Sequence, residues 1–159
     1  MQVRDFMIYQ VYTATPTTTV KELLSIFDKH SIGGLPVVDD KEKLLGMVTD
    51  GDILRFLSPN KEKFIASPYM TYVVEAETVD DVLSYKMNTP ISEIMVKKNI
   101  KTLTPDDDLC SAIRLISKHR FKKLPVVNGA GRVVGIISRG DVIQHLSRKT
   151  VEKELSTIS

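Results

Sequence analysis

The feature that most constrains the fold is an internal repeat at an offset of 89 residues. Residues 15–57 and 104–146 align without a gap, with 12 identities in 43 positions. The identities include Leu-Pro-Val-Val at 35–38 and 124–127 and Gly-Asp at 51–52 and 140–141. Upstream, residues 3–7 match residues 91–95 at an offset of 88. A repeat of this length predicts two similar structural units in one chain.

Each unit has the pattern β-α-β-β-α, so we expect an α+β fold of α/β type. A short extended stretch (10–14, 99–103) precedes Thr-Pro, and apolar residues at helical spacing then predict a helix that ends at His30 or His119. Short apolar runs predict strands over 35–38, 44–48, 124–127 and 133–137. A last helix is expected from about Asp50 to Leu57, and from Arg139 into the tail.

The repeat divides the chain into four parts: unit one (1–58), an insertion (59–90), unit two (91–150) and a tail (151–159). The insertion is longer than a simple connection and predicts a helix over about 79–87. It is either a linker that packs its helix on the pair, or a lid or partner-docking segment. The tail alternates basic and acidic residues, as an exposed helix end or a partner surface does.

Composition excludes several classes of protein. The 22 basic and 20 acidic residues leave a net charge of +2, which argues against binding of nucleic acid by charge alone. No apolar run of about 18 residues exists to span a membrane, and no signal peptide begins the sequence, so a cytoplasmic location is expected. One cysteine, Cys110, excludes an intrachain disulfide and a cysteine zinc site.

No catalytic or metal-binding constellation stands out. His30 and His119 occupy equivalent helix ends, and the acidic run at 106–108 is better explained as a helix cap than as a magnesium site. Cys110 has no base at a spacing that supports nucleophilic catalysis. The sequence therefore predicts no enzyme activity and no metal.

The candidate site lies where the second strand of each hairpin meets the following helix. Thr49 and Ser138 stand first, and Asp52 and Asp141 follow three residues later. Backbone N–H groups and the helix dipole favour an anion there, and a carboxylate can accept ribose hydroxyls. The structural alternative is a helix N-cap with an acid in the first turn, which needs no ligand.

The ordered set of motifs, present twice, resembles the cystathionine-β-synthase (CBS) domain. Unit one has Val-x-Asp-Phe-Met, Thr-Pro, Leu-Pro-Val-Val-Asp and Gly-Met-Val-Thr-Asp-Gly-Asp, and unit two repeats the series with similar residues. The resemblance implies a pseudo-twofold pair with two clefts for AMP, ADP, ATP or S-adenosylmethionine as regulatory ligand, with no required cofactor. It also implies a homodimer and gives Thr49, Ser138, Asp52 and Asp141 their ligand-binding roles.

The resemblance further assigns residues to each cleft. The first cleft is expected to comprise Ser138, Asp141, Lys122, Lys123, Ile136, Tyr12, Ile32 and Ile8. The second is expected to comprise Thr49, Asp52, Met47, Phe121, Lys101 and Val96. The positions before Leu-Pro face phosphates in the family, and they hold lysines in unit two but Gly33 and Gly34 in unit one. The Ser138 cleft is therefore predicted to be the better phosphate site.

The leading hypothesis is a regulatory module that binds an adenosine ligand and signals to an unknown protein effector by a conformational change. One alternative is a structural or oligomerisation module with vacant clefts. The other is a nucleic-acid-binding member of the family, which a steep salt dependence of oligonucleotide affinity would reveal.

Overall fold

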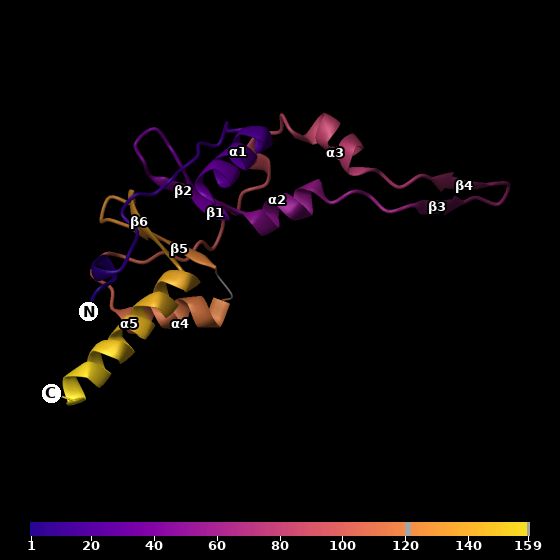
Figure 1. The fold of residues 1–159 in the computed structure, drawn as a ribbon. Helices are drawn as coiled ribbons and strands as arrows, with labels where there is room; N and C mark the ends of the chain where they lie inside the picture. The colour runs from indigo at the N-terminus through magenta and orange to yellow at the C-terminus, as the bar shows by residue number, and fades with distance from the viewer. Residues whose placement is uncertain (120–121, 159) are drawn as a thin grey trace.

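The computed structural model describes residues 1–119 and 122–158 and contains two repeated units, a projecting hairpin and a long C-terminal helix (Figure 1). The helices are α1 (Val20–His30), α2 (Asp50–Leu57), α3 (Val79–Lys86), α4 (Leu109–His119) and α5 (Arg139–Ile158). The strands are β1 (Gly34–Val38), β2 (Leu44–Thr49), β3 (Lys63–Ala66), β4 (Thr71–Val74), β5 (Lys123–Val127) and β6 (Val133–Ser138). Two short 3-10 turns are η1 (Val3–Asp5) and η2 (Ile91–Glu93).

Each unit is built on an antiparallel hairpin, β1–β2 in the first and β5–β6 in the second. The two registers are equivalent, because Gly34 pairs with Thr49 as Lys123 pairs with Ser138, and each hairpin has an irregularity before its last pair. The hairpins meet at a bridge between Lys43 and Arg132. The predicted α+β fold with two similar units is confirmed.

The extended stretches before Thr-Pro are shorter as strands than the β-α-β-β-α pattern predicts. Each is reduced to one parallel bridge, Ala14 to Val37 and Leu103 to Val126. The amide of Ala14 donates to the Pro36 carbonyl, and the amide of Val38 donates to the Ala14 carbonyl. The Thr-Pro that follows ends the pairing, since proline has no N–H to donate to a ladder.

The helices begin as the capping signals predict. The Thr19 side chain accepts a hydrogen bond from the Glu22 amide, and the Glu22 side chain accepts one from the Thr19 amide. In the acidic run before α4, the Asp108 carboxylate accepts a hydrogen bond from the Ser111 amide at 2.7 Å. This bond lowers the pKa of the Asp108 carboxyl, because it stabilises the charged form. The run therefore helps to cap α4.

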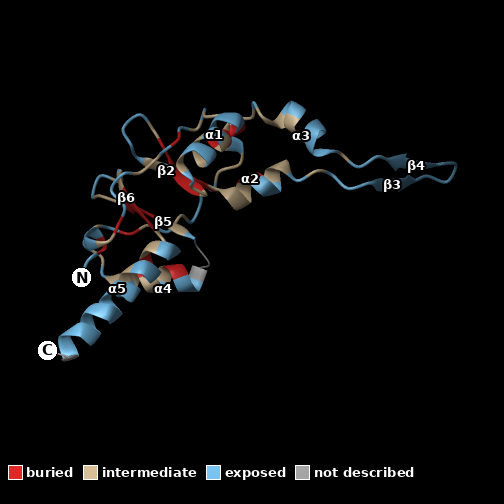
Figure 2. Ribbon diagram, in the orientation of Figure 1, coloured by how far each residue is buried: buried red, intermediate tan, exposed pale blue. Residues whose placement is uncertain are grey.

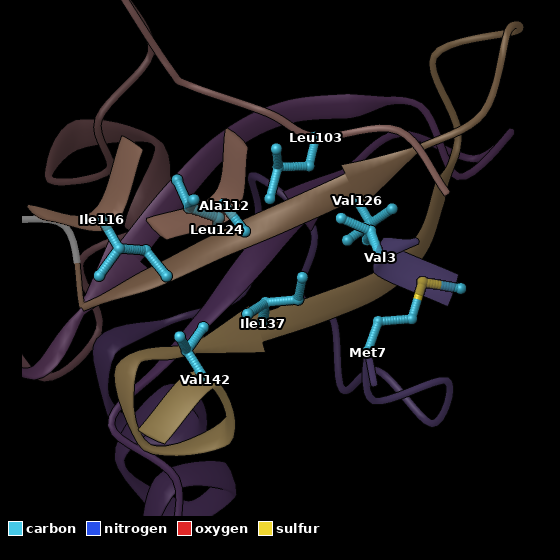
Figure 3. Close-up of a cluster of buried hydrophobic side chains, with 9 residues drawn as sticks. All are labelled: Val3, Met7, Leu103, Ala112, Ile116, Leu124, Val126, Ile137 and Val142. Atoms are coloured by element: carbon cyan, nitrogen blue, oxygen red, sulfur yellow. The ribbon is translucent and has the colours of Figure 1, made fainter. Parts of the chain in front are cut away.

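The first few residues of each unit pack in the core of the other unit. Val3 and Met7, from the start of unit one, are buried in the core of unit two against Val126 and Ile137 of its hairpin (Figure 3). Ile91, from the start of unit two, is fully buried in the core of unit one. The units are therefore interlocked, and each core contains side chains that the repeat assigns to the other unit.

The insertion has two parts with different surroundings. Helix α3 packs on unit one: Val82 is buried, and the Lys86 ammonium donates to the Phe56 carbonyl of α2 at 2.6 Å. The hairpin β3–β4 was not predicted and projects from the body with every strand residue exposed (Figures 1 and 2). Its apolar residues include Phe64, which is 71% exposed. We call residues 63–74 the arm.

Replacing the arm by a short Gly-Ser turn should shift the melting temperature by less than about 2 °C, since exposed residues away from the core contribute little. Differential scanning calorimetry of the shortened and complete chains checks this. A loss of several degrees would show that the arm supports the body.

Among the described residues, no helix is both long and apolar enough to cross a membrane. The second half of α5 extends beyond the body with its residues exposed (Figure 2). The charged tail is thus the end of an exposed helix.

Candidate functional site

A cavity of about 370 Å³ lies at the end of β2 and the start of α2. Binding sites for small molecules commonly have roughly this volume or more. Unit one contributes Met47, Thr49, Asp50, Gly51, Asp52 and Arg55 to its lining. Unit two contributes Val96, Asn99, Ile100, Lys101, Lys122, Lys123 and Pro125. The cavity is therefore shared between the units, and we call it the Thr49 cavity.

One wall of the Thr49 cavity is apolar, and a backbone pairing between the two units forms it. The amide of Met47 donates to the Val96 carbonyl at 3.0 Å, and the amide of Val96 donates to the Met47 carbonyl at 2.8 Å. This bridge holds Val96 beside Met47, with Ile100 and Pro125 completing the apolar lining. Such a wall suits the flat face of a nucleobase or another apolar group.

Asp52 is the acidic group at the helix start. Its Oδ2 accepts hydrogen bonds from both the amide and the hydroxyl of Thr49, each at 2.9 Å. Its Oδ1 accepts one from Nη2 of Arg55 at 2.7 Å. The Asp52 side chain is only 12% exposed, so the cap and Arg55 together fix its position at the cavity.

The same cap forms at Ser138, where the amide and hydroxyl both donate to Oδ2 of Asp141 at 2.7 Å. It forms again at Thr78 with Asp81, at the start of α3 and outside the cavity lining. The same cap therefore starts three helices of this chain, and it forms without a ligand. What distinguishes Thr49 and Asp52 is the cavity in front of them.

The Thr49 cavity is electropositive. Four cationic side chains line it, Arg55, Lys101, Lys122 and Lys123, against the two carboxylates of Asp50 and Asp52. The Lys122 ammonium lies 3.9 Å from Oδ1 of Asp50, and both side chains are exposed to solvent, so their attraction is weak. The lining carries two net positive charges, which favour an anionic ligand.

The lysine pair lies along the Thr49 cavity. The sequence grouped Lys122 and Lys123 with Ser138 and Asp141, but the structure places both among the residues that line the Thr49 cavity. The backbone of Lys123 does pair with Ser138. Its side chain, however, extends across to unit one, where a Cβ on Gly34 would lie 3.3 Å from the Lys123 Cδ. Gly34, without a side chain, leaves room for this crossing.

The other residues predicted for the Ser138 cleft lie in three places. Ile8 and Ile136 exchange two backbone hydrogen bonds, so their backbones lie side by side. The Tyr12 ring stacks on His30 with centroids 3.8 Å apart, and this contact covers one of its faces. Ile32 packs against the core of unit one.

For the Thr49 cleft, five predicted residues line one cavity: Thr49, Asp52, Met47, Val96 and Lys101. The sixth, Phe121, lies outside the described residues. Sequence reasoning missed Arg55, whose spacing of three from Asp52 puts both on one helix face and could have revealed it. It also missed Asn99 and Ile100, which no local motif marks, and Pro125, which belongs to the repeated Leu-Pro-Val-Val motif.

No group of three or more His, Cys, Asp or Glu side chains with metal-binding geometry occurs in the part of the chain that the structure describes.

Fold and cavity define a paired-repeat module with a shared interface cleft. The model of the CBS domain family matches residues 3–59 and 91–148, and the chain belongs to that family as a tandem pair.

Relatives extend the match over most of the chain. Inosine-5'-monophosphate dehydrogenase of Aquifex aeolicus is 32% identical over 138 residues, 87% of this chain and 23% of the dehydrogenase. CBS domain-containing protein CBSX2 of Arabidopsis thaliana is 28% identical over 162 residues, 98% of this chain and 67% of that protein. The chain thus spans under a quarter of the dehydrogenase, and two thirds of CBSX2.

Solved structures share the fold, and two of them contain adenosine ligands. The crystal structure of CBSX2 in complex with AMP has a TM-score of 0.72 at 24% identity, covering 94% of this chain and 98% of that one. The CBS domain pair of protein MJ0100, in complex with 5'-methylthioadenosine and S-adenosyl-L-methionine, has a TM-score of 0.70 at 26% identity, with the same coverage.

Proposed function

We propose that this chain is a regulatory module that binds an adenosine-containing ligand between its two CBS units and signals occupancy to a protein effector. The observation that carries the proposal is the Thr49 cavity, which combines an aliphatic wall, a fixed carboxylate and four cations in about 370 Å³. The crystallised relatives with AMP, 5'-methylthioadenosine and S-adenosyl-L-methionine support the adenosine class.

The lining residues suit the three parts of a nucleotide. The base packs against Met47 and Val96, and the ribose hydroxyls donate to the Asp52 carboxylate. The phosphates meet the lysines, because the first three amides of α2 already donate to Gly33, Asp50 and Thr49. AMP, ADP, ATP and S-adenosylmethionine are the candidates.

Signalling follows from the shared lining. Thr49 and Asp52 belong to unit one, whereas Lys101 and Lys122 belong to unit two. A ligand that contacts both stabilises one relative angle of the units over another, provided its affinity differs between the two arrangements. This role requires no catalytic group.

A cytoplasmic homodimer is part of the proposal. Leu54 on α2 and Ile143 on α5 are equivalent repeat positions, and they are 69% and 66% exposed. Two large apolar side chains repeated on the outer helices suit contact with a second copy.

The test is a titration of the complete chain with AMP, ATP and S-adenosylmethionine by calorimetry, with melting temperatures alongside. We expect Asp52→Asn to weaken AMP binding about tenfold, because a charge-assisted hydrogen bond to the ribose is lost. The matched control is Asp141→Asn, which changes the equivalent cap outside the Thr49 cavity and should weaken binding less.

Failure of every adenosine ligand to raise the melting temperature would contradict the proposal, since a ligand that binds only the native state must stabilise it. That result would favour the structural module with vacant clefts.

A further inference from the structure

Arg55 is the cation placed nearest the carboxylate that would receive the ribose. Its Nη2 lies 2.7 Å from Oδ1 of Asp52, while its side chain is 73% exposed. Oδ2 of Asp52 is already committed to the cap through Thr49. Oδ1 is thus the oxygen available to a ligand, and Arg55 occupies it in this structure.

A ribose hydroxyl that donates to Oδ1 therefore competes with Arg55. A guanidinium released at the cavity mouth needs another anion, and a phosphate accepts two of its N–H groups side by side. A ligand with phosphate supplies that anion. An uncharged adenosine ligand disturbs the Arg55–Asp52 pair without replacing it, and a cationic ligand adds repulsion.

The internal repeat allows the cations of the Thr49 cavity to be compared with the equivalent positions around Ser138. At an offset of 89 residues, the cations Arg55, Lys101, Lys122 and Lys123 correspond to Gln144, Tyr12, Gly33 and Gly34. All four counterparts are neutral. The cleft at Ser138 and Asp141 keeps the same cap with none of these cations, so the repeat retains the acid and varies the charge around it.

We propose that Arg55 makes the Thr49 cavity selective for adenosine ligands that carry phosphate, over uncharged 5'-methylthioadenosine and cationic S-adenosylmethionine. The inference rests on the proposed function, since it assumes that the ribose binds at Asp52. Arg55 acts as an exchangeable counterion: it pairs with Asp52 in the free cavity and with phosphate in the occupied one.

The experiment uses the complete chain with Asp141→Asn as background, so that calorimetry reports mainly the Thr49 cavity. ATP, AMP and 5'-methylthioadenosine are titrated into this protein with and without Arg55→Gln, which installs the residue found at the equivalent position, Gln144. We expect ATP affinity to fall about tenfold and 5'-methylthioadenosine affinity to stay within about twofold or to rise. Arg55→Lys should restore part of the ATP affinity.

The matched control is Arg139→Gln, which removes one positive charge at the start of α5, outside the lining of the Thr49 cavity. It should leave the ratio of ATP to 5'-methylthioadenosine affinity unchanged. An equal loss for both ligands in Arg55→Gln would assign Arg55 a merely structural role and overturn the inference alone. Absence of binding by all three ligands to the protein with Arg55 intact would overturn the proposed function, and the inference with it.

Discussion

Ile91→Ala should unfold unit one before unit two, although Ile91 opens the sequence of unit two. The side chain is fully buried among Leu23, Leu35 and Ile53, which belong to unit one. Truncation of a buried isoleucine leaves a cavity and costs about 2–5 kcal/mol of the free energy of unfolding. The loss should therefore appear in α1 and β1, far from the substitution along the chain.

Hydrogen exchange and chemical denaturation measure this effect. In Ile91→Ala, amide protection should fall first in α1 and β1, with α4 and β5 less affected. Ile65→Ala is the control, because Ile65 lies in the arm and is 55% exposed, so its truncation should change stability by less than about 0.5 kcal/mol. Loss of protection first in α4 and β5 would mean that Ile91 supports its own unit and that the exchange of segments does not occur in solution.

The elements of the two units could be predicted because their signals are local. Thr19 and Glu22 form the capping box that the sequence indicates, and α1 ends at His30 as expected. The runs around Pro36 and Pro125 form the inner strands of two equivalent hairpins. The repeat then doubled the evidence for each element.

The exchange of segments and the direction of the lysine side chains could not be predicted, because both depend on how the units pack. Nothing in residues 3–7 says that Val3 enters the other core. Lys123 is the first residue of β5 in unit two, yet its side chain lies against Gly34 of unit one and lines the Thr49 cavity. The repeat shows which positions are equivalent, but not which of the two units each side chain contacts.

The arm was missed for a different reason. Its strands hold Phe64, Ile65, Tyr72 and Val73, a composition typical of strands, but two Ser-Pro pairs and flanking charges interrupt the pattern. A two-stranded hairpin without a core has little burial to mark it. Helix α3, with an Asp81 cap and a buried Val82, carries the usual signals and was predicted.

Gly46→Ala should reduce both the stability of the fold and the affinity for ligand, because Gly46 lies against Val96, which pairs with Met47 in the wall of the Thr49 cavity. A Cβ at this position would lie 2.8 Å from the Val96 carbonyl oxygen and 3.0 Å from the Met95 sulfur. Backbone cannot give way as a side chain does, so the Met47–Val96 hydrogen bonds must lengthen. We expect a loss of about 1–3 kcal/mol in stability, as for other overpacked sites.

The equivalent substitution, Gly135→Ala, separates the two effects. Its Cβ would meet Met7, at 2.5 Å from the sulfur and 3.1 Å from Cγ, and both are atoms of a flexible side chain that can adopt another rotamer. We therefore expect a smaller loss of stability and AMP affinity within about twofold of the unchanged chain, whereas Gly46→Ala should lose about fivefold or more as Val96 moves. Calorimetric titration and thermal melting of both variants test this. Equal losses of AMP affinity would show that the Val96 wall does not position the base, because only Gly46 contacts that wall.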